Sequence, residues 1–248
     1  MEKKYKNPSL TFFFIIICVI VFVLEIFSSY YYGENFLNYI FSEYGLSLQN
    51  ILSGKIWVFL TSIFLHASPE HLILNIIALF FFGKVVEQQL GRKKFLLAFF
   101  ISGLIGDIFV ITSSLIGLSS ATVPTIGASA AIFGLMGMAM ISKPLELIFY
   151  PYLIPIPLVL VALIYTLYNI ATFLLVLSGQ TSSDISYISH IGGLLAGLIM
   201  GFGEEKSKRG FVIILFILAL LLTTPFVYII ISFLENFNYI NILSRFFG

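Results

Sequence analysis

The chain has 248 residues, of which 59% are hydrophobic and only 10% are charged, and its mean hydropathy is +1.05. This much apolar surface excludes a water-soluble globular domain and indicates a membrane protein with several spans. The formal net charge of +1 is uninformative as a total, and the single cysteine, Cys18, excludes both a disulfide framework and a thiolate metal cluster.

Seven apolar segments in the sequence have the character of membrane spans, for which about 20 apolar residues are needed to cross roughly 30 Å. They are Leu10–Tyr30, Leu72–Leu90, Phe95–Gly117, Ser129–Ile141, Leu153–Leu177, Ile188–Phe202 and Phe211–Phe233. The fourth is too short to cross alone, and the polar stretch SSATVPTIGAS precedes it. We therefore expect a helix that begins part-way into the membrane after a descending loop. The expected fold class is all-α: a polytopic membrane helical bundle with seven spans, forming a single domain over residues 1–248.

The distribution of basic residues predicts the orientation of the chain. With seven spans and a cytoplasmic N-terminus, eleven of the thirteen Lys and Arg residues lie on the cytoplasmic side, and only Lys55 and Arg245 lie outside. The first segment has the basic start of a signal peptide, but its long apolar run favours an uncleaved anchor. The loop over residues 31–57 would then be external and interfacial.

The chain contains only three histidines, His66, His71 and His190. Two of them lie in the stretch HASPEHLILN, where the sequence Ser-Pro-Glu at residues 68–70 predicts the start of a helix. His71 and Asn75 are four residues apart and therefore share one face of that helix. Both side chains can donate hydrogen bonds near the outer end of a span.

The third histidine precedes a repeat of small residues. Gly193, Gly197 and Gly201 recur every four residues, a pattern that lets two helices approach closely, and His190 lies on the same face. The helix packed against this face must also be thin, and the segment GASAAIFGLMG is the best candidate. Packing is therefore expected to bring Ser129 close to His190.

Ser129 has two interpretations. A serine in a membrane helix is usually a packing or back-bonding residue. As a nucleophile it would need a neighbouring base to take its proton, and it would gain from the free N–H groups of a helix start. Asp107 in the third span requires a partner, and Asp184 could orient His190, but we favour a dyad over a triad.

Together, HASPEHLILN, GASA and SHIGGLLAG, in this order, resemble the rhomboid family of intramembrane serine proteases. The resemblance implies a rhomboid-like fold of six helices plus one extra C-terminal transmembrane helix over residues 211–235, with the protease core itself over residues 55–203. It implies that Ser129 is the nucleophile and His190 the general base and acid. It implies neither a cofactor nor a metal ion.

The resemblance also implies roles for five supporting residues. His71 and Asn75 would assist the oxyanion, Gly127 would shape the serine loop, Phe133 would pack beside the general base, and His66 would brace the loop.

The sequence departs from the family in a few places. Ala130 follows the serine where many members have glycine, and Phe133 replaces a tyrosine seen in some members. Trp57 resembles the tryptophan of the family's membrane-surface loop. In the family this tryptophan is often followed by arginine, whereas here it is followed by Val58.

We therefore expect an intramembrane serine endopeptidase that cleaves transmembrane segments of other membrane proteins. Its partners would be these substrates and membrane lipids, with no nucleic acid, and it would be a multi-pass protein of a prokaryotic cell membrane. We expect substrates with small residues at the cut to fit a site lined by glycine and alanine. The fifth span, entered through the proline-rich YPYLIPIP, would be the gate.

Three alternatives remain open. A catalytically silent rhomboid-like protein that binds transmembrane helices as a chaperone would keep the fold, but it would not need Ser129 and His190 together. A metalloprotease would carry the His-Glu-x-x-His pattern, which is absent from the sequence. A transporter could use Asp107 and the histidines as a proton path, but it predicts two related halves, which the sequence does not show.

Overall fold

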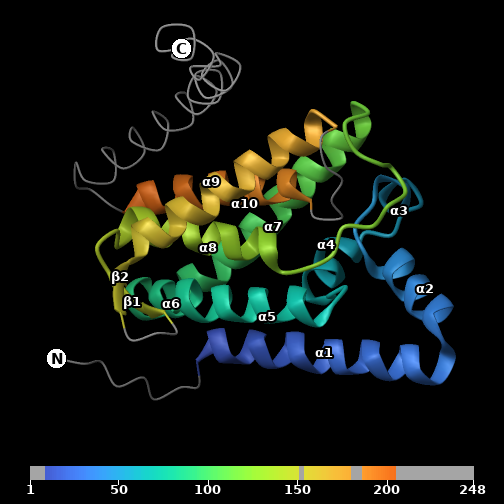
Figure 1. The fold of residues 1–248 in the computed structure, drawn as a ribbon, viewed down its shortest axis with the longest axis horizontal. Coiled ribbons are helices and arrows are strands. Elements are labelled where there is room, and N and C mark those ends of the chain that lie inside the picture. The colour runs from blue at the N-terminus through green and yellow to red at the C-terminus, as the bar shows by residue number, and fades with distance from the viewer. Residues whose placement is uncertain (1–8, 151–153, 180–185, 205–248) are drawn as a thin grey trace, which may run out of the picture. The chain divides into compact units, whose positions relative to one another are not determined.

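The computed structural model describes residues 9–150, 154–179 and 186–204 (Figure 1). The elements are α1 Leu10–Tyr32, α2 Glu34–Tyr44, α3 Leu48–Leu52, α4 Val58–Thr61, the 3₁₀ turn η1 Ser62–Phe64, α5 Pro69–Ala78, the π-helical turn η2 Leu79–Gly83, α6 Lys84–Leu90, α7 Arg92–Leu115, α8 Ser129–Ser142, β1 Leu147–Tyr150, β2 Ile154–Pro157, α9 Leu158–Leu177 and α10 Tyr187–Glu204. The predicted span Phe211–Phe233, the extra helix over residues 211–235 and Asp184 lie outside the described residues.

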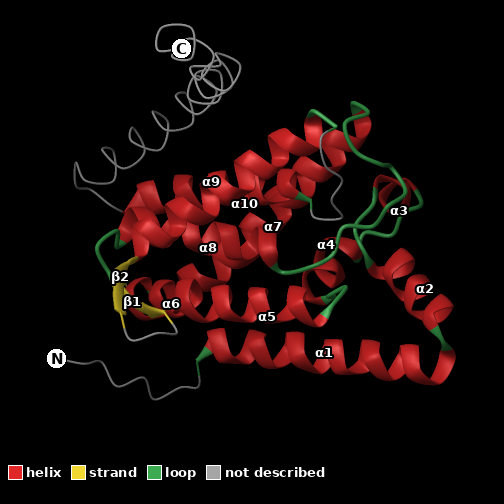
Figure 2. Ribbon diagram, in the orientation of Figure 1, coloured by secondary structure: helices red, strands yellow, loops and turns green. Residues whose placement is uncertain are grey.

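Four helical stretches in the described ranges are long and apolar enough to cross a membrane: Leu10–Tyr32, Pro69–Leu90, Arg92–Leu115 and Leu158–Leu177. The second is built from α5, η2 and α6 in succession, and α8 and α10 are shorter apolar helices. The described chain is therefore an all-α membrane protein with one small hairpin (Figure 2).

One predicted boundary is wrong. The fifth span was expected to begin at Leu153, but α9 begins at Leu158 because β2 pairs antiparallel with β1. Pro155 and Pro157 explain the difference, since proline lacks the N–H that a helix requires and forces the preceding residue into an extended conformation.

Helix α8 forms the centre of the bundle and contacts α5, α6, η2, α7, α9 and α10 (Figure 1). Every residue of α8 is buried except Ser129 and Phe133, which are one helical turn apart. At about 1.5 Å per residue, α8 is about 21 Å long, which is shorter than the membrane core of roughly 30 Å. This helix can be almost wholly buried because neighbouring helices surround it.

The seam between α8 and α10 is made of small residues. A Cβ atom added to Gly193 would overlap the carbonyl oxygen of Ala130, and one added to Gly197 would overlap that of Gly134. The backbones are therefore in direct contact, which confirms the predicted packing of the two small-residue faces.

Helix α1 is fixed to the bundle at its N-terminus by the Glu87 carboxylate of α6. This carboxylate accepts hydrogen bonds from the Ser9 hydroxyl at 2.6 Å, the Leu10 N–H at 2.7 Å, and the N–H and hydroxyl of Thr11 at 2.9 and 2.8 Å. Glu87 thus supplies the acceptors that the first turn of α1 lacks within its own helix.

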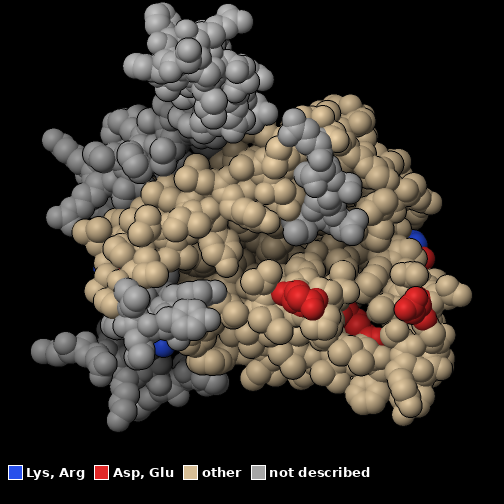
Figure 3. Space-filling view, in the orientation of Figure 1, with Lys and Arg blue, Asp and Glu red and all other residues tan. Residues whose placement is uncertain are grey.

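The outer surface is suited to lipid. Figure 3 shows a face on which charged side chains are sparse. Large apolar side chains of α1 point away from the bundle, with Phe13, Ile16 and Ile20 each 54% exposed. In water such a surface would be unfavourable, whereas in a membrane it contacts hydrocarbon.

Candidate active site

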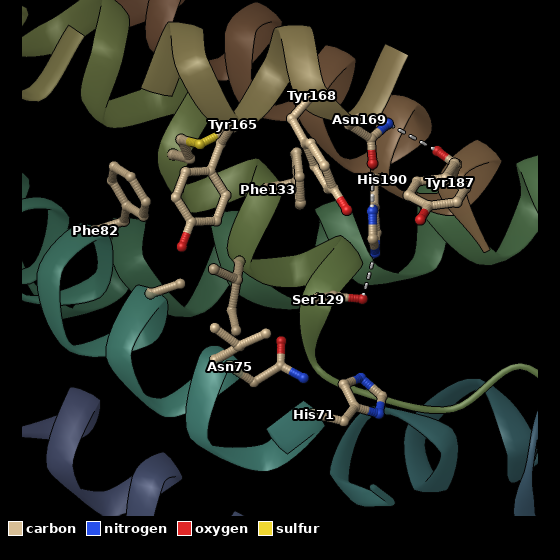
Figure 4. A pocket seen from close by; sticks show the side chains of 14 residues that line it. His71, Asn75, Phe82, Ser129, Phe133, Tyr165, Tyr168, Asn169, Tyr187 and His190 are labelled. Carbon is tan, nitrogen blue, oxygen red and sulfur yellow. Dashed lines mark hydrogen bonds between the residues drawn. The ribbon is translucent and has the colours of Figure 1, made fainter. Parts of the chain in front are cut away.

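A cavity of about 160 Å³ lies among α5, η2, α8, α9 and α10 (Figure 4). It is lined by His71, Leu74, Asn75, Ala78, Phe82, Ser129, Ile132, Phe133, Met136, Tyr165, Tyr168, Asn169, Tyr187 and His190. The two residues of α8 that are not fully buried, Ser129 and Phe133, both face this cavity.

Ser129 is the first residue of α8, and the segment before it is held at two points. Thr125 exchanges backbone hydrogen bonds of 2.7 and 2.9 Å with Leu46, and the Gly127 N–H donates to the Ser62 carbonyl at 2.8 Å. Because this segment is anchored to the loop between α2 and α3 and to η1, the serine hydroxyl has a fixed place at the cavity wall.

His190 lies in the first turn of α10, with Nε2 2.7 Å from the Ser129 hydroxyl oxygen. Its ring stacks on that of Phe133, with centroids 4.5 Å apart and planes 9° from parallel, and Tyr187 contacts it edge-on at 6.0 Å. The imidazole is therefore held on both sides in an orientation that lets Nε2 accept the serine proton.

Asn169 of α9 also contacts this imidazole, and it was not singled out in the sequence. Its Oδ1 lies 2.5 Å from His190 Nδ1, and its side chain is buried. The sequence shows Asn169 only as an amide side chain inside an apolar span, and polar side chains inside a membrane often mark functional sites. The described site therefore joins three side chains in a row, Ser129, His190 and Asn169.

His71 and Asn75 line the same cavity, and in Figure 4 the Ser129 hydroxyl lies between them and His190. The Ser68 hydroxyl accepts the His71 N–H at 3.1 Å, which confirms the predicted helix start. The Asn75 Nδ2 is buried and has no hydrogen-bond partner among the described residues. This leaves a donor beside the serine that is free to bind an incoming oxygen.

Gly127 lies against these two donors. Its φ of +116° is in the region that favours glycine, and a Cβ there would be 2.6 Å from His71 Nε2 and 3.6 Å from Asn75 Nδ2. Only a residue without a side chain allows this close approach.

His66 lies behind the site rather than in the cavity. Its Nδ1 donates to the Phe64 carbonyl at 3.0 Å, its backbone N–H donates to Glu25 at 3.2 Å, and its ring centroid is 5.1 Å from that of His71. Burial and, to a smaller extent, the neighbouring His71 lower the pKa of His66 to about 4. His66 is therefore a neutral side chain that packs against one donor of the site.

The expectation of a cavity lined by glycine and alanine is wrong. The walls are large apolar and aromatic side chains, including Phe82, Met136, Tyr165 and Tyr168. The small residues lie instead in the seam, where α8 and α10 approach each other so closely that these residues have no surface exposed to the cavity.

Asp107 is buried in α7 and lies away from the cavity lining. Its Oδ2 has no hydrogen-bond partner among the described residues. Within the same ranges, no three His, Cys, Asp or Glu side chains lie close enough to hold a metal ion.

Comparison with known proteins places this site in a family. The family model for the rhomboid domain matches residues 53–207, which is more than half of the chain. The chain belongs to the rhomboid family. The matched range contains the serine, both histidines of the cavity and Asn169.

Individual relatives are of more than one kind. The chain is 32% identical to the rhomboid-family protein YdcA of Bacillus subtilis over 163 residues, covering 64% of this chain and 73% of YdcA. It is 28% identical to the rhomboid protease GluP of the same organism over 205 residues, covering 82% of this chain but 36% of GluP. It is 37% identical to the inactive RHOMBOID-like protein 8 of Arabidopsis thaliana over 99 residues, covering 40% of this chain and 26% of that protein.

Proposed function

We propose that this rhomboid-family chain is a serine endopeptidase that cleaves transmembrane segments of other membrane proteins. The observation that carries the proposal is the 2.7 Å contact between Ser129 Oγ and His190 Nε2 at the wall of a cavity that also holds two hydrogen-bond donors. A serine hydroxyl is a weak nucleophile until a neighbouring base accepts its proton, and this contact provides that base.

In the first half of the reaction, Ser129 Oγ attacks the carbonyl carbon of the scissile peptide while His190 Nε2 takes the hydroxyl proton. Negative charge then develops on the former carbonyl oxygen. The Asn75 amide, the His71 ring and the Ser129 backbone N–H at the start of α8 are the donors available to it. His190 next gives its proton to the leaving amine, which leaves an acyl group on Ser129.

In the second half, a water molecule attacks this acyl group while His190 takes a proton from it. The same donors stabilise the second oxyanion. The bond between the acyl carbon and Ser129 Oγ then breaks, His190 returns the proton to Oγ, and the fragment leaves with a new carboxyl terminus. One residue thus serves as base and acid in turn, and no metal ion or cofactor is needed for either step.

The cavity suits an unwound apolar segment of a substrate. Its walls are almost entirely apolar, and its volume of about 160 Å³ accommodates a medium-sized apolar side chain next to the cut. A substrate helix hides its carbonyls in hydrogen bonds, so residues that unwind easily, such as Gly, Ser and Pro, favour cleavage nearby. We infer that substrate enters between α5 and α9, whose residues form opposite walls.

The same proposal includes the cellular setting. The protein would be a multi-pass protein of a prokaryotic cell membrane with its N-terminus in the cytoplasm, as the basic residues favour. The alternative is a silent protein that binds transmembrane helices, and it has one specific support: a relative whose name calls it inactive.

The test is proteolysis by the purified chain reconstituted into liposomes with a single-span reporter protein that carries a fluorescent tag at each end. We expect wild type to cut the reporter into two fragments, each carrying one of the two tags. Ser129→Ala and His190→Ala should each lower the rate by at least about 10⁴-fold.

Ser142→Ala is the matched control, because Ser142 is the last residue of the same helix and its hydroxyl has no hydrogen-bond partner among the described residues. Its rate should equal that of wild type. If wild type captures the reporter without cutting it, the helix-binding alternative is correct.

A further inference from the structure

Asn169 has a geometry that bears on the chemistry of His190, although it lies on a different helix. It is buried in α9, and its side chain makes two hydrogen bonds: Oδ1 contacts His190 Nδ1 at 2.5 Å, and Nδ2 donates to the Tyr187 carbonyl at 3.3 Å (Figure 4). Both partners belong to the first turn of α10.

The second of these bonds fixes which end of the amide faces the histidine. A backbone carbonyl can only accept, so the atom of Asn169 that faces Tyr187 must be the nitrogen. The atom that faces His190 is then the oxygen, which can only accept in turn. His190 Nδ1 must therefore carry a proton and donate it to Asn169.

The tautomer decides whether His190 can act as a base. A neutral imidazole has one N–H and one lone pair, so a proton on Nδ1 leaves the lone pair on Nε2. Nε2 is the atom that lies 2.7 Å from Ser129 Oγ. With the other tautomer, Nε2 would itself be a donor and could not take the serine proton.

We propose that Asn169 is a positioning residue that holds His190 in its Nδ1–H tautomer, with Nε2 aimed at Ser129. This inference rests on the proposed function for its catalytic meaning, while the tautomer itself is a property of the resting protein. The Asn169 oxygen accepts the same proton before and after His190 is charged, so the amide need not move during proton transfer.

The seating of α9 on the bundle controls this contact. The buried residues of α9 form one narrow stripe, Leu158, Ala162, Thr166 and Asn169, and Asn169 is its last member. The reactive tautomer is thus set by a helix other than the one that carries the base. Displacement of the end of α9 would leave His190 free to adopt either tautomer.

The experiment compares wild type with Asn169→Leu, which keeps the side-chain shape but removes both hydrogen bonds. Thr166→Val is the matched control, since Thr166 lies one turn earlier on the same buried stripe. Among the described residues, its hydroxyl bonds only the Ala162 carbonyl of its own helix. The proteins are labelled with ¹⁵N-histidine, and the His190 signals are identified by their loss in His190→Ala.

In wild type and in Thr166→Val, we expect nitrogen chemical shifts of the Nδ1–H tautomer at His190. In Asn169→Leu, the signals should move towards the Nε2–H tautomer. In the reporter assay, kcat of Asn169→Leu should fall about 10- to 100-fold with little change in KM. This loss is part of the rate enhancement of roughly 10²–10⁴-fold that a positioned general base supplies. Thr166→Val should keep the wild-type kcat.

An Nε2–H tautomer at His190 in wild type would overturn the inference. So would an unchanged spectrum and kcat in Asn169→Leu, or equal losses of kcat in Asn169→Leu and Thr166→Val, which would indicate packing alone. The spectrum is measured without substrate, so it tests the tautomer independently of cleavage. Absence of cleavage by wild type would therefore count against the proposed function alone.

Discussion

The backbone of Gly197 in α10 rests on the carbonyl group of Gly134 in α8, with no space between them for a side chain. This contact lies one turn below the pair Gly193 and Ala130, which meet in the same way next to Ser129 and His190. The spacing of the two helices, and with it the distance between serine and histidine, is therefore set by the absence of side chains along one seam.

Gly197→Ala tests the seam. The added methyl group must push α8 and α10 apart, so we expect the free energy of unfolding to fall by about 1–3 kcal/mol, measured by denaturation in detergent. Gly203→Ala is the matched control, because Gly203 lies on the same helix and its Cβ would meet nothing within 4 Å. Equal stability of the two variants would show that the seam tolerates separation.

Gly127→Ala tests the approach of the serine loop to the two donors. A methyl group there would press on the His71 ring, so we expect kcat to fall by about 10²–10³-fold, the loss typical of one oxyanion donor. Gly117→Ala carries the same kind of backbone strain, with φ of +77°, but its Cβ has open space. It should keep the wild-type kcat, and a matching loss there would mean that strain alone explains the effect.

Glu87→Ala tests the anchoring of α1. Removing the carboxylate leaves the donors of the first turn of α1 without their acceptor, and we expect a loss of about 2–3 kcal/mol in the free energy of unfolding. Glu34→Ala, at an exposed position in the first turn of α2, should change stability far less. If the two variants unfold alike, the contacts of Glu87 contribute little.

His66 gives the folded protein a dependence on pH. Its pKa of about 4 in the folded state lies below the ordinary value of 6.5, so between these values the unfolded chain binds a proton that the folded protein does not. Stability from this group is full above pH 6.5 and is lost as the pH falls towards 4, by at most about 1.4 kcal/mol per pH unit.

His66→Gln should therefore lose less stability than wild type when the pH is lowered from 7 to 5. The measurement is denaturation of both proteins at each pH. Parallel curves would show that His66 does not titrate differently in the two states.

The sequence predicted those parts of the fold that depend on local pattern. The start of α5 could be predicted because Ser68, Pro69 and Glu70 each suit one position of a helix start. The contact of α8 with α10 could be predicted because glycines four residues apart mark a face that accepts another backbone.

The missed features depend on tertiary register. Asn169 looks like one polar residue in an apolar span, and only the packing of α9 against α10 turns its amide towards His190. Glu87 caps a helix that begins 77 residues earlier, at Leu10, a contact that no local pattern encodes. The lining of the cavity was predicted wrongly for the same reason. The glycines and alanines expected to line it are buried in the seam between α8 and α10.

The most direct test of the proposed chemistry is covalent labelling with a fluorophosphonate probe, followed by peptide mapping of the modified residue. We expect wild type to be labelled at Ser129, Ser129→Ala not at all, and His190→Ala only at a greatly reduced rate. Absence of labelling in wild type that unfolds cooperatively, alongside a rhomboid protease of known activity that is labelled, would contradict the assignment of Ser129 as an activated nucleophile.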